Sequence, residues 1–165
     1  VGELALRGPQ VMREYWNMPE ETNQAFANGW FLTGDLATQD GDGFVSIVDR
    51  AKDIIISAGM NIYPREIEEV LMIHPSISEV AVLGVPSLVR EEVVKAFIVP
   101  LEDAELSKMD VVEFCIGKLA KHKIPKQFEF RSELPKSSIG KILKRVLMDE
   151  EREKSDAKLR RRNPS

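Results

Sequence analysis

The chain has 165 residues, of which 43% are hydrophobic and 30% charged, a composition typical of a globular protein with one full domain and a smaller piece. Its net charge of -4 argues against a general attraction to nucleic acid or anionic membranes, although residues 158–165 are locally basic. Cys115 has no second cysteine to pair with, and no apolar run approaches the roughly 20 residues that cross a bilayer. We therefore expect a cytoplasmic protein without a transmembrane segment or a nucleic-acid partner, in which Cys115 fills core.

Residues 1–49 are predicted to form short strands and turns, with a polar helical stretch at 19–29. The first residue is Val1 rather than Met, and the strand-like opening has nothing before it to pair with, so we expect a piece of a longer protein. The DGDG segment at 40–43 resembles a calcium loop, but Phe44 stands where the third acidic ligand should be. A tight hairpin turn without metal is the better interpretation.

From Ala51 the pattern changes to interleaved strands and helices. The isoleucines at 54–56 predict a buried strand, and residues 64–74 predict an amphipathic helix that starts at Pro64. The apolar stripe of that helix contains Ile67, Val70, Leu71 and His74.

Two strands rich in β-branched residues follow at 78–85 and 93–101, and Ser107 with Asp110 predicts the capping box of a second helix. The expected apolar stripe of this helix contains Val112, Cys115, Ile116 and Leu119. A short strand at 123–130, a loop at 134–141 and a charged helix that frays into a disordered tail at 151–165 complete the chain. This order predicts an α+β domain with a mixed or antiparallel sheet and flanking helices.

Three polar clusters lie among the apolar strands. Residues 33–35, Thr-Gly-Asp, place a carboxylate at a strand end, where it would bind a pair of hydroxyls or a turn amide. Residues 49–53 alternate in charge, as in a solvated turn or a defined pivot between domains. The segment 134–141, LPKSSIGK, holds Lys141 on a loop as either a surface residue or a mobile cation for a phosphate. It lacks the glycine and the Ser or Thr of a Walker loop, and His74 and His122 lack companion metal ligands.

Taken together, these clusters closely resemble the adenylate-forming superfamily of acyl-CoA synthetases, luciferases and adenylation domains. The resemblance runs from about Gly2 to Val146. It is carried by EYWNMPEET, WFLTGD, DRAKDIIISAGMNIYPREIE and LPKSSIGK, in that order.

The resemblance implies that a carboxylic acid, ATP and CoA are joined through an acyl-AMP intermediate by an acid-thiol ligase, with fatty acids as the expected substrates. It implies that residues 1–49 end a large N-terminal domain and that residues 50–150 form a mobile lid. The N-terminal domain would be the lid's partner and would hold most of the ATP and Mg²⁺. The isolated chain is therefore expected to be inactive.

The resemblance also assigns roles to single residues. Asp35 matches the aspartate that holds the ribose hydroxyls of ATP, and Arg50 matches an arginine that contacts the same nucleotide. Lys52 matches the hinge about which the lid turns, and Lys141 matches the lysine that reaches the substrate carboxylate and the α-phosphate during adenylation.

The segment Ser57, Ala58 and Gly59 matches the strand that lines the pantetheine tunnel for CoA, whereas Glu66 is given only a structural role. The surface loop departs from the family pattern at Pro86-Ser87 and Glu91-Glu92. Three alternatives remain open: an aryl-CoA ligase, a peptide-synthetase adenylation domain, and a non-catalytic interaction module that retains the lid fold.

Overall fold

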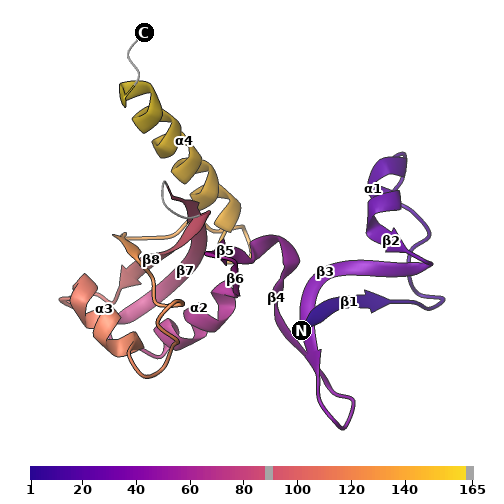
Figure 1. Ribbon diagram of the computed structural model, residues 1–165, viewed down its shortest axis with the longest axis horizontal. Helices are drawn as coiled ribbons and strands as arrows, with labels where there is room; N and C mark the ends of the chain where they lie inside the picture. Colours follow the sequence, from indigo (N-terminus) through magenta and orange to yellow (C-terminus); the bar gives the residue numbers. More distant parts are fainter. Residues whose placement is uncertain (88–90, 163–165) are drawn as a thin grey trace. The chain divides into compact units, whose positions relative to one another are not determined.

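The computed structural model describes residues 1–87 and 91–162, with only the backbone for 158–162 (Figure 1). The chain forms two compact units, Val1–Asp53 and Ile54–Ser165. A short 3-10 helix, η1 (Ala51–Asp53), ends the first unit. The sequence analysis puts its boundary slightly earlier, between residues 49 and 50, and the assignment of the two parts to domains stays a prediction.

The first unit is an antiparallel sheet built around one long strand, β3 (Trp30–Gln39). This strand pairs with β1 (Gly2–Leu6), with β2 (Phe26–Ala27), which follows helix α1 (Pro19–Ala25), and with β4 (Val45–Arg50). In the β3–β4 turn, the Asp40 carboxylate accepts hydrogen bonds from the amides of Asp42 at 3.0 Å and Phe44 at 2.9 Å. The predicted hairpin turn is therefore confirmed, because Asp40 serves the backbone of its own turn.

The first unit buries few of its own side chains. Leu36, Ala37 and Asp49 are its buried members among the residues described, whereas Trp16 and Phe44 are 83% and 73% exposed. The faces of this sheet are thus largely uncovered by its own residues.

The second unit is built on a mixed three-stranded sheet. Strand β7 (Ile77–Pro86) is antiparallel to β8 (Glu92–Pro100), and β9 (Gln127–Phe130) runs parallel to β8. Helices α2 (Pro64–Met72) and α3 (Lys108–Cys115) lie on one side of β7 and β8, and α4 (Lys144–Arg162) lies on the other (Figure 1).

Alternation along β7 supplies both cores of this unit. Val80 and Val82 pack with the helices α2 and α3, while Ala81 and Leu83 pack with Leu147 of α4. Both faces of the strand are buried, which explains its nearly continuous apolar sequence. The predicted α+β fold with a mixed sheet and flanking helices is confirmed.

The start of helix α3 follows the prediction, and its end does not. The Ser107–Asp110 capping box is present and Cys115 is buried, as expected. Ile116, however, is 63% exposed, because the helix ends at Cys115 and Ile116 is extended, with φ of -62° and ψ of 130°. The predicted stripe is therefore wrong at Ile116, since helical spacing no longer applies there.

The isoleucine run is buried only in alternation. Strand β5 (Ile55–Ser57) pairs with β6 (Met60–Ile62), and within β5 Ile55 is 1% exposed while Ile56 is 47% exposed. Successive side chains of a strand point to opposite faces, so this short hairpin buries only one face of the run.

A charged network attaches α4 to the sheet. Lys95 of β8 is only 7% exposed and contacts Glu129 of β9 at 2.7 Å and Glu151 of α4 at 2.8 Å. Lys154, one helical turn after Glu151, contacts the same two carboxylates at 2.9 and 2.6 Å. Arg131 pairs with Glu129 as well.

The prediction of a disordered tail from residue 151 is consequently wrong as far as Arg162, where α4 ends. High local charge suggested a solvated end, but Glu151 and Lys154 have partners on the sheet. Residues 163–165 lie outside the described residues. None of the helices in the described chain is long and apolar enough to span a membrane.

This network makes the stability of the second unit depend on pH in the acid range. Burial alone would raise the pKa of Glu129, but hydrogen bonds from Lys95, Lys154 and Arg131 outweigh it and lower that pKa from 4.5 to about 2. A lowered pKa in the folded state means that the stabilisation is complete at neutral pH and is lost as the pH falls towards 2. We expect the free energy of unfolding to drop by about 2 to 3 kcal/mol from this group between about pH 5 and pH 2.

Urea unfolding of Glu129→Gln at several pH values checks this expectation. The variant should be less stable than the wild type at neutral pH and should lose less stability on acidification. Glu133→Gln, at an exposed glutamate, is the matched control. An acid-induced loss in Glu129→Gln equal to that of the wild type would contradict the assignment.

Candidate functional site

Asp35 and Arg50 form a cross-strand ion pair in the first unit. The β3–β4 register places them opposite one another, and Arg50 Nε lies 3.1 Å from Asp35 Oδ1. Their side chains are 36% and 46% exposed respectively, so solvent and ligands can reach both groups. Arg50 Nη2 also donates to the carbonyl of Thr33 at 3.3 Å, which fixes the guanidinium beside the carboxylate.

The backbone around Asp35 is held by strand β1. The Thr33 hydroxyl donates to the Leu4 carbonyl at 2.8 Å, and the Gly34 amide donates to the Glu3 carboxylate at 3.0 Å. Asp35 therefore sits on a fixed segment and keeps its second oxygen, Oδ2, free of the residues described. A carboxylate of this kind can accept hydrogen bonds from a diol, and the adjacent guanidinium can contact an anion.

Lys52 lies in η1 and is exposed. It precedes the end of the first unit by one residue, so a change in its backbone angles would redirect everything that follows. Its position fits a pivot, and its role as the hinge stays a prediction.

The predicted tunnel residues lie at the turn between β5 and β6. Ala58 and Gly59 are exposed and have φ of +53° and +74°, the backbone of a tight hairpin turn that is strained for alanine. Ser57 is buried instead, and its hydroxyl donates to the Glu92 carbonyl at 2.7 Å. Ser57 thus supports the turn, whereas Ala58 and Gly59 are exposed, and the contact of this segment with CoA stays a prediction.

Lys141 belongs to an ordered hairpin rather than to the irregular loop expected from its turn-forming residues. The Ser137 amide donates to the Lys141 carbonyl at 2.8 Å, and the Gly140 amide donates to the Ser137 carbonyl at 2.9 Å. Gly140 has φ of +79°, the left-handed position that closes a three-residue hairpin loop. The Lys141 amide also donates to the Ser137 hydroxyl at 3.1 Å. The Lys141 side chain is exposed to solvent.

The three lysines of this segment differ in their pairing. Lys136 contacts Glu79 of β7 at 2.5 Å, and Lys144 contacts Glu68 of α2 at 2.8 Å. No side chain described in the structure pairs with the Lys141 ammonium. Lys141 is therefore the cation of this group that is available to an external anion.

Sequence reasoning missed the glutamates that support these elements. Glu3, Glu68, Glu79 and Glu92 bind partners 14 to 57 residues away, so spacing along the chain gives no signal for them. Glu66, which is expected to be structural, accepts hydrogen bonds from Lys123 with both of its oxygens at 2.7 Å. The described residues contain no group of three or more His, Cys, Asp or Glu that could hold a metal ion.

Comparison with curated proteins finds long-chain-fatty-acid–CoA ligases among the relatives of this chain. The chain is 52% identical over 157 residues to a long-chain-fatty-acid–CoA ligase of Escherichia coli O157:H7, covering 95% of the chain and 28% of the ligase. It is 51% identical over 152 residues to the ligase of that name from Bacillus subtilis, covering 92% of the chain and 27% of the ligase. The chain thus spans little more than a quarter of the length of these relatives.

Solved structures of adenylate-forming enzymes share the fold of this chain. ATP-bound MatB from Rhodopseudomonas palustris superposes with a TM-score of 0.85 at 40% identity, covering 90% of this chain and 30% of that one. The o-succinylbenzoate CoA synthetase of Bacillus subtilis, bound to its acyl-adenylate intermediate, gives 0.82 at 38% identity and covers 88% and 30%.

The family model of the AMP-binding enzyme C-terminal domain matches residues 66–141, from helix α2 to the exposed lysine of the hairpin. The chain therefore contains an AMP-binding enzyme C-terminal domain and belongs to the adenylate-forming superfamily.

Proposed function

We propose that this chain is the C-terminal part of an AMP-forming acyl-CoA synthetase. The whole enzyme would first join a carboxylic acid to ATP, forming acyl-AMP and pyrophosphate, and would then transfer the acyl group to CoA, releasing AMP. The ligase relatives at 51% and 52% identity support this activity, and the chain's share of their length supports a further, N-terminal domain.

The observation that carries the proposal is the ammonium of Lys141, which has no partner among the side chains that the structure describes. Its neighbours Lys136 and Lys144 are neutralised by glutamates, whereas Lys141 is exposed at the rim of a rigid hairpin. In the adenylation step such a cation would neutralise the negative charge that grows between the carboxylate and the α-phosphate. One well-placed donor of this kind lowers the barrier by on the order of 3 kcal/mol, about a hundredfold in rate.

The other residues would divide between the two steps. Asp35 would accept hydrogen bonds from the ribose hydroxyls, and Arg50 would hold that carboxylate in place and contact the nucleotide. Lys52 would be the hinge about which the lid rotates between its two positions. The Ala58–Gly59 turn would lie against the pantetheine arm of CoA, where the small side chains leave room for a slender chain.

ATP and CoA would be bound mainly outside this chain. The described residues offer no group of three or more His, Cys, Asp or Glu that could hold Mg²⁺, and the ion would be held by the N-terminal domain. The uncovered faces of the first unit favour this domain as the partner. The isolated chain would be inactive, and the intact enzyme would be cytoplasmic.

A fatty acid is the favoured substrate, because the fatty-acid ligases share more identity with this chain than the solved o-succinylbenzoate enzyme does, 52% against 38%. An aryl acid is the second candidate. A non-catalytic module is disfavoured, because such a protein has no physical reason to keep Asp35, Arg50 and an unpaired Lys141 together.

Replacing Lys141 by alanine in the intact enzyme should remove the charge needed only in the first step. We expect acyl-AMP formation, followed by ATP–pyrophosphate exchange, to fall about a hundredfold or more. Thioester formation from supplied acyl-AMP should be largely retained.

Lys121→Ala, at an exposed lysine after helix α3, is the control for loss of one positive charge. Equal loss of both half-reactions in Lys141→Ala would contradict the assigned role. Measurable ATP–pyrophosphate exchange by the isolated chain would contradict the proposal that it lacks half of the site.

Replacing Lys52 by proline tests the hinge. Proline fixes φ near -65°, which suits the 3-10 helix seen here but prevents the backbone from adopting another conformation. We expect Lys52→Pro to impair thioester formation more than adenylation. Lys52→Ala, which removes the side chain but leaves the backbone free, should keep the wild-type ratio of the two rates. An unchanged ratio in Lys52→Pro would mean that the pivot lies elsewhere.

A further inference from the structure

The hairpin that carries Lys141 is fastened at its base by two glutamates of the neighbouring elements. Lys136 stands on one side of the hairpin and Lys144 follows the other, and an isolated bridge joins residues 136 and 142 between them. Lys136 pairs with Glu79 of β7 and Lys144 pairs with Glu68 of α2. Two separate elements thus hold the two ends of one small loop.

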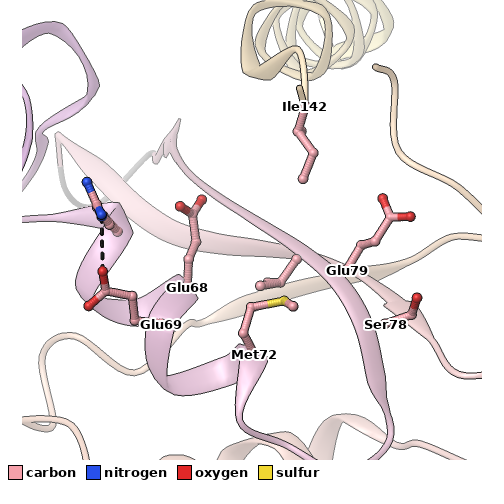
Figure 2. A pocket seen from close by; sticks show the side chains of 8 residues that line it. Glu68, Glu69, Met72, Ser78, Glu79 and Ile142 are labelled. Atoms are coloured by element: carbon pink, nitrogen blue, oxygen red, sulfur yellow. Dashed lines mark hydrogen bonds and ion pairs between the residues drawn. The ribbon is translucent and has the colours of Figure 1, made fainter. Parts of the chain in front are cut away.

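Figure 2 shows how these groups lie around a cleft. Glu68 rises from α2, Glu79 rises from β7, and Ile142 points down towards them from the end of the hairpin. Met72 lines the floor of the same cleft. Ile142 packs against the core beneath α4, so the ion pairs and an apolar contact act on the same segment.

Glu68 is itself fixed by the sheet. Its Oε1 accepts a hydrogen bond from the Val82 amide at 2.7 Å and contacts Lys144 Nζ at 2.8 Å, and its side chain is 18% exposed. The carboxylate therefore links the backbone of β7 to the residue that begins α4. A group with two such partners and little solvent has one preferred position.

Glu79 gives up hydration to hold Lys136. Its Oε1 contacts Lys136 Nζ at 2.5 Å, while its Oε2 is buried and accepts no hydrogen bond from the described residues. Burying a carboxylate oxygen without a hydrogen-bond donor costs free energy, and this cost offsets part of the stabilisation from the contact between Glu79 and Lys136. Such a cost is understandable where the position of the partner matters.

A third glutamate of the cleft provides a natural comparison. Glu69 lies on the same helix as Glu68 but pairs with Arg65 of its own helix, at 3.0 Å (dashed line in Figure 2). It lines the cleft without contacting either hairpin lysine. Charge in the cleft and contact with the hairpin can therefore be separated experimentally.

We infer that Glu68 and Glu79 are positioning residues for Lys141, which act by fixing the base of its hairpin through Lys144 and Lys136. The inference rests on the function proposed for Lys141. It adds that the accuracy with which this lysine is presented depends on two acidic residues that touch no substrate.

The structural half of the inference is tested on the chain itself by amide hydrogen exchange measured by NMR. In the double variant Glu68→Gln, Glu79→Gln, the amides of Ser137, Gly140 and Lys141 should exchange about threefold to tenfold faster, the scale for losing two partly exposed ion pairs. Glutamine keeps an acceptor for the Val82 amide, so the core should remain intact. The amides of Lys126 and Arg131, which donate to β8 at the far edge of the sheet, should not change.

The functional half is tested in the intact enzyme. The same double variant should slow acyl-AMP formation by about threefold to tenfold and leave thioester formation from supplied acyl-AMP unchanged. Glu69→Gln should behave as wild type in both assays. Exchanging the charges, with Lys136→Glu and Glu79→Lys together, should restore most of the rate lost in Glu79→Gln, which a purely steric role would not do.

Each outcome has a defined meaning. Unchanged exchange at the hairpin, or faster exchange without slower adenylation while Lys141→Ala still abolishes that step, would overturn the inference and leave the proposed function standing. If Lys141→Ala itself adenylates normally, the proposed function fails and the catalytic part of the inference fails with it. Should the double variant not fold, Glu79→Gln alone is subject to the same criteria.

Discussion

The buried ammonium of Lys95 is the constraint on which the second unit depends. A cation in the middle strand of a sheet costs several kcal/mol unless carboxylates surround it, and here β9 and α4 each supply one. Helix α4 lies across the sheet and supplies the second of these carboxylates, Glu151. Because the Lys141 hairpin leads directly into that helix, the position of α4 also determines where the hairpin ends.

Two kinds of charged contact follow from this arrangement. The contacts of Lys95 are shared with two carboxylates and involve a lysine side chain that is only 9% exposed, so they fix whole elements relative to one another. The contacts of Lys136 and Lys144 concern a single loop, and that of Lys136 is the more exposed of the two. Lys141 differs from both, since its charge is not compensated within the described structure. A lysine of this kind suits a task in which the compensating anion arrives with the substrate.

How much the sequence predicts depends on the distance between interacting residues. The Asp40 turn, the Ser107 capping box and the amphipathic character of α2 were all predicted, because each rests on residues within a few positions of one another. The order of four motifs was enough to identify the superfamily, since the resemblance depends on residue types and not on contacts.

Contacts between distant residues explain what could not be predicted. The helix at 151–162 looked disordered because its charges seemed to lack partners, and those partners lie on β8 and β9. The glutamates beneath the hairpin gave no pattern either, since Glu79 and Lys136 are 57 residues apart. Ile116 was misplaced for a local reason, the early end of α3.

The ion pairs of Lys136 and Lys95 differ in their exposure to solvent, so they respond differently to ionic strength. Salt screens exposed charges more strongly than buried ones, and the side chain of Lys136 is 40% exposed against 9% for Lys95. Rising salt would therefore weaken the contact of Lys136 with Glu79 more than the contacts of Lys95. The position of the hairpin and the attachment of α4 would then depend on different ion pairs.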